Sequence, residues 1–305
     1  MTVLAIVGPT ASGKSDVALI LAEEAGADIV SVDSMQVYRG MDIGTAKPDA
    51  AVQARVRHHL IDLADPEADF TLADYQAAGV DTLDRLAAAS RMALLVGGSG
   101  LHFRALVDPV TPAPTDAAVR ADLEAAPPDM LVAELLDRDP GAGAFVDLAN
   151  PRRVLRAVEI LRLTGASPSR RAAATERRDL EGYLAVRPFV AVGFDPGDGL
   201  AGRIDRRLRA MIDAGLVDEV ARLQHRLGRT ARHAVGYRQL RGVADGTVPL
   251  AAGVAAARRA TVGLARRQRT FFRRDPRIRW LPWHDDASVR AQRARTVFEE
   301  LSWIS

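Results

Sequence analysis

Residues 8–15 read Gly-Pro-Thr-Ala-Ser-Gly-Lys-Ser and fit the pattern G-x-x-x-x-G-K-[ST] at every fixed position. The apolar run Val3–Val7 precedes this stretch, and a helical pattern through Leu19, Ile20 and Leu21 follows it. In a strand–loop–helix context of this kind, backbone N–H groups and the helix N-terminus attract phosphate oxygens. The stretch therefore predicts a phosphate loop (P-loop) for a diphosphate or triphosphate.

Each residue type in the loop has a chemical use. The terminal glycines let the backbone curl, Lys14 supplies a positive charge, and Ser15 is placed to ligate Mg²⁺. We predict that the whole loop contacts the diphosphate or triphosphate, through Gly8, Pro9, Thr10, Ala11, Ser12, Gly13, Lys14 and Ser15.

Further apolar runs predict the rest of an α/β fold. Asp28–Val32 reads as a second strand that ends at Asp33, Met92–Val96 as a third that ends in the loop 97–100, and Pro188–Phe194 as a later one. Short apolar strands separated by helical segments favour a parallel sheet with helices on both faces. Active-site groups are expected at the carboxyl ends of the strands.

A proline-rich connector, VDPVTPAPTD, follows Leu106. The residues after it are rich in Ala, Leu and Arg at helical spacing, and we predict an inserted all-helical domain over residues 115–183. Residues 1–114 and 184–305 then form the catalytic core. Within the core we expect helices over about 200–227 and 249–272.

Composition narrows the class of protein. The 305 residues include no Cys, which excludes disulfides, thiolate nucleophiles and Cys-based metal sites. No apolar run is long enough to span a bilayer, and the N-terminus lacks the basic region of a signal peptide, so we expect a cytoplasmic protein. With no coiled-coil pattern, we expect a monomer.

Charge is unevenly distributed, although the net charge is only +2. From Arg203 to Arg279 there are 19 Arg and no Lys against 6 Asp or Glu, a local charge of +13. This cluster predicts a polyanionic partner such as RNA. A preference for Arg in the genome is the alternative, because Lys14 and Lys47 are the only lysines. That alternative explains the choice of Arg but not the clustering.

The acidic residues argue against a nucleotide hydrolase. In such enzymes an Asp that helps to hold Mg²⁺ follows an apolar strand, whereas the third strand here ends in Gly-Gly-Ser-Gly. Asp33 instead follows the second strand and would face the acceptor across the phosphate loop. It could also simply cap a following helix, since Asp is a favoured N-cap residue.

The motifs GPTASGKS, SVDSMQVYRGMDIGTAKP, HHLIDLADP, VGGSGLHFRAL, NPRRVLRAVEI, HAVGYRQL and ARRQRTFFRRDPRIRWL occur in this order along nearly the whole chain. In this series the chain resembles the bacterial tRNA dimethylallyltransferases. The resemblance implies Mg²⁺-dependent transfer of a dimethylallyl group from dimethylallyl diphosphate to the exocyclic amine of adenosine 37, beside the tRNA anticodon. It also implies a P-loop core with an inserted helical domain that embraces the anticodon stem-loop.

The resemblance also assigns residues. It makes Asp33 the catalytic base, with Thr10 and Lys14 as catalytic partners at the diphosphate. It also places the element Arg266, Arg267 and Gln268 at the entry to the diphosphate site, with Arg266 as a diphosphate contact. The positions that match tRNA contacts are Asp33, Ser34, Met35, Gln36, Ser99, Arg152, Arg153, Arg156, His233, Gly236, Tyr237 and Arg238.

The chain departs from the family pattern in three places. Val262 and Gly263 stand where an arginine that helps to bind the diphosphate is usual. Ser99 and His102 replace the usual Thr and Tyr, and Phe272 replaces the usual Trp. The missing arginine puts in doubt how tightly the donor is held.

Two other features need an interpretation. Adjacent His58 and His59 cannot both face one metal ion, so we assign them to local hydrogen bonds. The alternative functions are an isopentenyltransferase for free adenine nucleotides, a P-loop small-molecule kinase, and an RNA-binding module that has lost its activity. The basic C-terminal third argues against the first of these, and the intact loop and Asp33 argue against the last.

Overall fold

The computed structural model describes residues 2–174 and 179–302. The chain forms two compact units, Met1–Val107 with Ala185–Ser305, and Asp108–Leu184. The inserted unit therefore begins at Asp108, ahead of the boundary at 115 that we expected, because the proline-rich connector belongs to it. It ends at Leu184, next to the expected 183.

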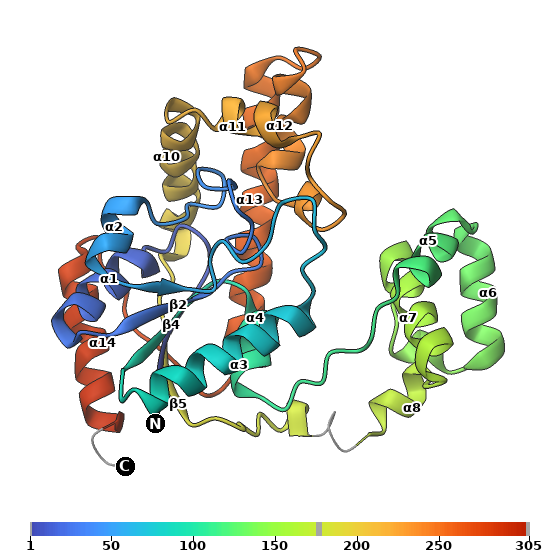
Figure 1. The fold of residues 1–305 in the computed structure, drawn as a ribbon, viewed down its shortest axis with the longest axis horizontal. Helices are drawn as coiled ribbons and strands as arrows, with labels where there is room; N and C mark the ends of the chain where they lie inside the picture. Colours follow the sequence, from blue (N-terminus) through green and yellow to red (C-terminus); the bar gives the residue numbers. More distant parts are fainter. Residues whose placement is uncertain (1, 175–178, 303–305) are drawn as a thin grey trace. The chain divides into compact units, whose positions relative to one another are not determined.

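A single parallel sheet organises the larger unit (Figure 1). Its strand order is β3-β2-β4-β1-β5-β6, with central β1 bonded to β4 on one side and β5 on the other. The strands are β1 Val3–Val7, β2 Asp28–Val32, β3 His58–His59, β4 Ala93–Gly97, β5 Phe189–Gly193 and β6 Ile278–Trp280. Because all pairs are parallel, every strand ends at the same edge of the sheet. The predicted α/β fold is confirmed.

Helices cover both faces of this sheet (Figure 1). On one face, Val17 and Leu21 of α1 and Phe298 of α14 pack with Ile6 and Val192. On the other face, helices α3, α4, α11, α12 and α13 enclose a larger apolar core. The helices of this unit are α1 Lys14–Ala25, α2 Ala50–Arg55, α3 Leu72–Ala88, α4 Gly100–Val107, α10 Leu200–Asp213, α11 Leu216–Leu223, α12 Tyr237–Ala244, α13 Leu250–Arg273 and α14 Ala287–Ser302, with 3₁₀ turns at Gly197–Gly199 and Ala231–His233.

Sequence patterns missed the edges of the sheet and one helix break. Strands β3 and β6 have two and three residues, too few to show an alternating pattern. The helix expected over 200–227 is divided at Gly215, whose φ of +95° lies in the left-handed region. The third strand is shifted by one residue from the predicted 92–96.

Among its described residues, 108–174 and 179–184, the inserted unit contains helices joined by loops and no strand. Leu123, Leu131, Leu135, Val154 and Val158 form its own core. Its helices are α5 Ala117–Ala125, α6 Pro128–Arg138, α7 Pro151–Thr164 and α8 Pro168–Ala172, with a 3₁₀ turn at Ala142–Ala144. In neither unit is any described helix both long and apolar enough to cross a membrane.

Candidate active site

The phosphate loop joins β1 to α1 at the carboxyl edge of the sheet. Gly8 has a φ of +150°, and a Cβ there would lie 2.5 Å from the carbonyl oxygen of Phe194, so only glycine fits. Gly13 precedes α1 in a left-handed conformation, with a φ of +78°. The two fixed glycines of the motif thus adopt the backbone conformations that a curled, anion-binding loop requires.

Lys14 is the first residue of α1, and its ammonium remains close to the loop. Its Nζ donates to the carbonyl oxygen of Pro9 over 3.2 Å. Burial and, to a smaller extent, the positive charge of Arg207 lower the pKa of Lys14 to about 8, although the negative charge of Asp33 acts in the opposite direction. A bound anion would relieve both unfavourable effects, so this lysine is suited to a diphosphate ligand.

Side chains from two later helices hold the loop. Arg207 Nη1 donates to Thr10 Oγ1 (3.1 Å), and Arg203 Nε donates to the carbonyl oxygen of Ala11 (2.8 Å). Both arginines come from α10, one helical turn apart. Gln268 of α13 accepts a hydrogen bond from Thr10 N over 2.8 Å.

Our sequence analysis did not single out these two arginines. Their i, i+4 spacing in a basic helix was the available signal, because it places both on one face. They bring positive charge to the loop even though the arginine expected near Val262 and Gly263 is missing. Burial lowers the pKa of Arg207, as expected for a cation that has lost water.

Asp33 follows β2 directly and closes a turn. Its Oδ1 accepts a hydrogen bond from Met35 N over 2.8 Å. The next helix, α2, begins only at Ala50, so Asp33 is not a helix cap. Its negative charge acts on the pKa values of Lys14, Arg207 and His102, which shows that all three groups are electrostatically close to it.

Two cavities meet at this loop. A cavity of about 280 Å³ is lined by Thr10, Lys14, Asp33, Arg207 and Gln268, among others. A larger open groove of about 1250 Å³ lies between the loop, α10 and residues 39–53. Lys14, Ser15 and Arg207 line both, so the groove leads to the cavity that contains the carboxylate.

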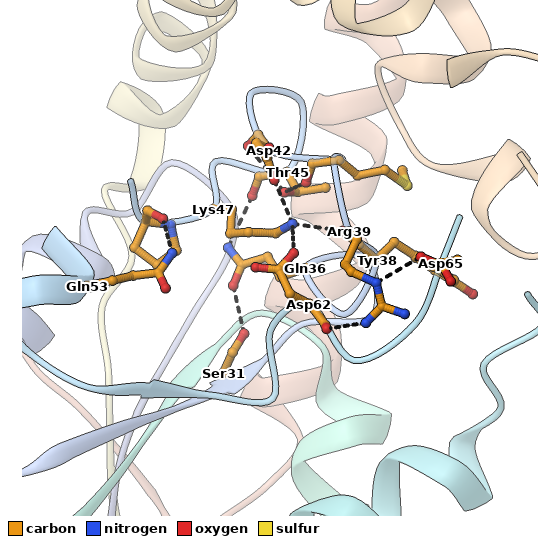
Figure 2. Close-up of polar contacts among 12 residues, drawn as sticks. Ser31, Gln36, Tyr38, Arg39, Asp42, Thr45, Lys47, Gln53, Asp62 and Asp65 are labelled. Atoms are coloured by element: carbon orange, nitrogen blue, oxygen red, sulfur yellow. Dashed lines mark hydrogen bonds and ion pairs between the residues drawn. The ribbon is translucent and has the colours of Figure 1, made fainter. Parts of the chain in front are cut away.

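The segment after β2 is tied to the strand by Gln36 (Figure 2). Gln36 Oε1 accepts from Ser31 Oγ (2.7 Å), and its Nε2 donates to the carbonyl oxygens of Thr45 and Ala46 (3.2 Å each). Gln36 is a predicted RNA contact, but its side-chain amide makes its hydrogen bonds within the protein. Met35 lines the smaller cavity beside Asp33.

At the end of β4, Ser99 Oγ lies 2.7 Å from His102 Nδ1. Burial lowers the pKa of His102 to about 4, so the ring is neutral at neutral pH. Residues 97–100, from the end of β4 to the start of α4, include no Asp or Glu. Ser99 and His102 supply a hydroxyl and a neutral imidazole instead of a Mg²⁺ ligand of the nucleotide-hydrolase type.

Of the predicted contacts at 233–238, Tyr237 points into the protein. Its side chain is fully buried and donates a hydrogen bond to Glu219, and burial with this contact raises the pKa of Tyr237. Gly236 has a φ of +96° and also lies inside. His233 and Arg238, on either side, are exposed.

The predicted arginines of α7 separate into two groups. Arg152 and Arg153 are exposed, whereas Arg156 is half-buried and donates to Glu159 and to the carbonyl oxygen of Ala113 (2.7 Å). Arg156 thus compensates a buried carboxylate within the inserted unit. Although Arg152 and Arg156 are four residues apart on α7, only Arg152 is exposed.

The predicted entry element lies on α13. Arg266 is exposed there and is not among the described residues that line either cavity, and its contact with the diphosphate stays a prediction. Gln268, from the same predicted element, contacts the loop. The two histidines behave as predicted: His58 Nδ1 donates to the carbonyl oxygen of Val56 (2.8 Å), and His59 Nε2 lies 2.8 Å from Asp28 Oδ2.

Comparisons with known proteins identify the family of the chain. A family model described as IPP transferase matches residues 36–275. A tRNA dimethylallyltransferase of Parafrankia sp. is 44% identical over 97% of this chain and 92% of that protein. One from Streptomyces coelicolor is 42% identical over 92% and 89%. The chain belongs to the IPP transferase family.

A solved structure supports the same assignment. The full-length tRNA isopentenylpyrophosphate transferase from Bacillus halodurans superposes with a TM-score of 0.70 at 33% identity, and the match covers 99% of this chain and 98% of that one. The similarity therefore includes both units of this IPP transferase. It also includes the phosphate loop, which precedes the residues matched by the family model.

The start of α1 carries oxygen ligands of the kind that Mg²⁺ uses together with phosphate oxygens. Among the described residues no group of three or more His, Asp or Glu side chains could hold a metal by itself. Ser15 and Asp16, however, are exposed at the start of α1 and line both cavities. Mg²⁺ usually keeps several waters and takes its other ligands from one or two protein groups and substrate phosphates.

Proposed function

We propose that this IPP transferase moves a dimethylallyl group from dimethylallyl diphosphate to the N6 amine of adenosine 37 in tRNA and releases diphosphate. The names of its relatives state the activity class, and nothing in the site favours a second function. The observation that most directly supports this proposal is that the carboxylate of Asp33 lines the same small cavity as the cationic groups Lys14 and Arg207.

The chemistry needs one group at each end of this cavity. The bond between C1 of the dimethylallyl group and the diphosphate oxygen breaks, and its electron pair leaves with the diphosphate. Loop N–H groups, Lys14 and Arg207 stabilise the negative charge that develops there. The N6 nitrogen forms the new bond to C1, and its proton passes to the Asp33 carboxylate.

The hydroxyl of Thr10 accepts a hydrogen bond from Arg207, and it would donate a hydrogen bond to the diphosphate. Mg²⁺ would be held by Ser15 and would supply additional positive charge to the leaving diphosphate. No step needs a covalent intermediate with the protein, which agrees with the absence of cysteine.

We also propose the RNA partner. An adenine base must leave its stack to enter a cavity of this size, as in other enzymes that act on nucleobases. Ser34, Met35 and Ser99 would surround the extruded base. The exposed cations Arg152, Arg153 and Arg238 would contact the phosphates of the anticodon stem-loop. We expect the enzyme to act as a cytoplasmic monomer.

A transfer assay tests this function. The protein is incubated with Mg²⁺ and labelled dimethylallyl diphosphate, and with an anticodon stem-loop RNA, the same RNA with guanosine at position 37, or AMP. We expect label in the first RNA only. Faster labelling of AMP would assign the enzyme to free nucleotides. A parallel incubation with labelled ATP tests the kinase alternative, to which transfer of its phosphate to AMP in place of prenyl transfer would assign the enzyme.

A further inference from the structure

Lys47 is an unusual residue in this chain, which uses Arg at every other basic position except Lys14. Its side chain is only 3% exposed. The ammonium donates to three acceptors: the carbonyl oxygen of Tyr38 (2.7 Å), Asp42 Oδ1 (2.7 Å) and Asp62 Oδ1 (2.6 Å) (Figure 2). An ammonium has three N–H donors, so all of them have a partner here.

These three contacts join two segments of chain that are far apart in sequence. Tyr38 and Asp42 lie in the segment after β2, whereas Asp62 lies in the segment after β3. Both segments contain non-glycine residues in the left-handed region, at Ala46 (φ 49°), Leu60 (φ 60°) and Asp62 (φ 55°). Such conformations persist only where surrounding contacts hold them, and they concentrate at functional sites.

Lys47 holds residues 44–48, which separate the two cavities. We call this segment the wall. Ala46 and Pro48, the neighbours of Lys47 in sequence, each line both the open groove and the smaller cavity. The other face of this wall is bonded to Gln36, whose Nε2 donates to the carbonyl oxygen of Ala46. Gln36 Oε1 in turn accepts a hydrogen bond from Ser31 Oγ in β2, the strand that directly precedes Asp33.

A second contact fixes the same wall from the opposite side. Glu219 of α11 is buried and accepts from the backbone N–H groups of Asp42, Ile43 and Gly44, over 2.9 to 3.1 Å. Asp42 is therefore held by its backbone to Glu219 and by its side chain to Lys47. The wall has little freedom to move while both contacts are present.

We propose that Lys47 is a positioning residue for prenyl transfer. Its three bonds hold residues 44–48 in place and so fix Asp33 relative to the phosphate loop. The inference rests on the proposed function. Arginine cannot replace it well, because a planar guanidinium cannot direct three donors at three acceptors placed around one point.

The test compares Lys47→Met, Lys47→Arg and a matched control, Arg85→Met. Arg85 forms an exposed ion pair with Asp81 on α3, away from both cavities. Single-turnover prenylation of the RNA is measured at saturating donor and RNA, together with donor affinity and thermal unfolding. Misplacement of reacting groups by about 1 Å costs on the order of a hundredfold in rate.

We expect Lys47→Met to lower the single-turnover rate roughly tenfold to a hundredfold, with Lys47→Arg between it and the wild type. Donor affinity should change by less than about threefold, since Lys14 and Arg207 are untouched. A purely stabilising role would instead lower the unfolding temperature and leave the rate of the folded fraction unchanged. That outcome, or a normal rate in Lys47→Met, overturns the proposal.

If Lys47→Met does not fold, Asp62→Asn decides the question. It removes one charged acceptor and keeps the cation, and we expect a smaller loss of rate with a folded protein. Wild-type rates in both Asp62→Asn and Lys47→Arg would overturn the proposal. A wild-type protein that does not prenylate RNA at all would refute the proposed function instead. Hydrogen exchange then tests the wall alone: faster exchange confined to residues 34–48 and 58–64 in Lys47→Arg supports it, and unchanged exchange overturns it.

Discussion

Asp33 combines an observed structural hydrogen bond with the catalytic role that we propose for it. One carboxylate oxygen accepts from Met35 N, which leaves the other oxygen toward the cavity that Lys14 also lines. An Asn at this position can keep the bond to Met35 but cannot accept a proton at neutral pH.

We therefore predict that Asp33→Asn folds normally and loses turnover by roughly the 10²–10⁴ typical of general-base catalysis. Donor affinity should be little changed, because the diphosphate is bound by other residues. The measurement is single-turnover prenylation with thermal unfolding as a control for folding. A near wild-type rate in the folded variant would refute the role of Asp33 as the base.

The lowered pKa of Lys14 predicts that the affinity for the donor depends on pH. This pKa is lowered from 10.5 to about 8, so between these values the unfolded chain holds a proton that the free folded protein has released. In that window the free energy of unfolding increases with pH, because the unfolded state binds more protons. A diphosphate favours the protonated lysine, so its affinity should decrease as pH rises through about 8.

Calorimetric titration with dimethylallyl diphosphate between about pH 7 and about pH 9 checks this prediction. We expect an affinity loss on the order of tenfold, the fraction of protonated lysine that is lost over this range. The matched variant Lys14→Met should bind weakly at every pH and lack this decrease. Identical pH profiles for the two proteins would contradict the assignment.

At the level of single elements, α10 brings charge to the phosphate loop from a distant part of the sequence. Arg203 and Arg207 face the loop, while Arg209 on the same helix is exposed to solvent. The helix therefore offers a variant and a control with the same change of side chain.

We predict that Arg207→Met weakens donor binding and slows transfer, because a buried cation beside the leaving diphosphate is removed. A loss on the order of a hundredfold in kcat/KM is expected for one such donor. Arg209→Met should remain within about twofold of the wild type, as exposed charges contribute little. Equal effects of the two substitutions on kcat/KM would show that only the overall charge matters.

For the whole molecule, the important feature is how the inserted unit joins the core. Val186 N donates to the carbonyl oxygen of Val107 over 2.8 Å, so the chain leaves and re-enters the core at one point. The inserted unit also has its own apolar core and its own buried ion pairs, between Glu159 and the arginines Arg120 and Arg156.

Replacement of residues 108–184 by a short Gly-Ser linker should therefore leave a core that unfolds cooperatively and binds dimethylallyl diphosphate within about threefold of the full chain. Affinity for the anticodon stem-loop should fall at least roughly tenfold, because the phosphate contacts that we propose for Arg152 and Arg153 would be lost. Both affinities can be measured by titration. Unchanged RNA affinity would remove the inserted unit from RNA recognition.

The sequence alone was sufficient for the features that depend on local pattern. The phosphate loop, three of its neighbouring strands and the acid after β2 are each contained in a few consecutive residues with a strong signal. The helical character of the inserted unit follows from periodicity in the same way. These features could be predicted because their physical cause lies within the segment.

Only the tertiary structure decided which distant side chains meet at the loop. Arg203 and Arg207 have ordinary local surroundings in the sequence, and their partners in the loop are fixed by how α10 packs. The partners of Lys47 away from the loop are likewise fixed by how the segments after β2 and β3 pack. The same packing turned Tyr237 and Arg156 inward and left Arg266 outside. Burial and charge pairing depend on the whole fold, and a short sequence pattern cannot contain them.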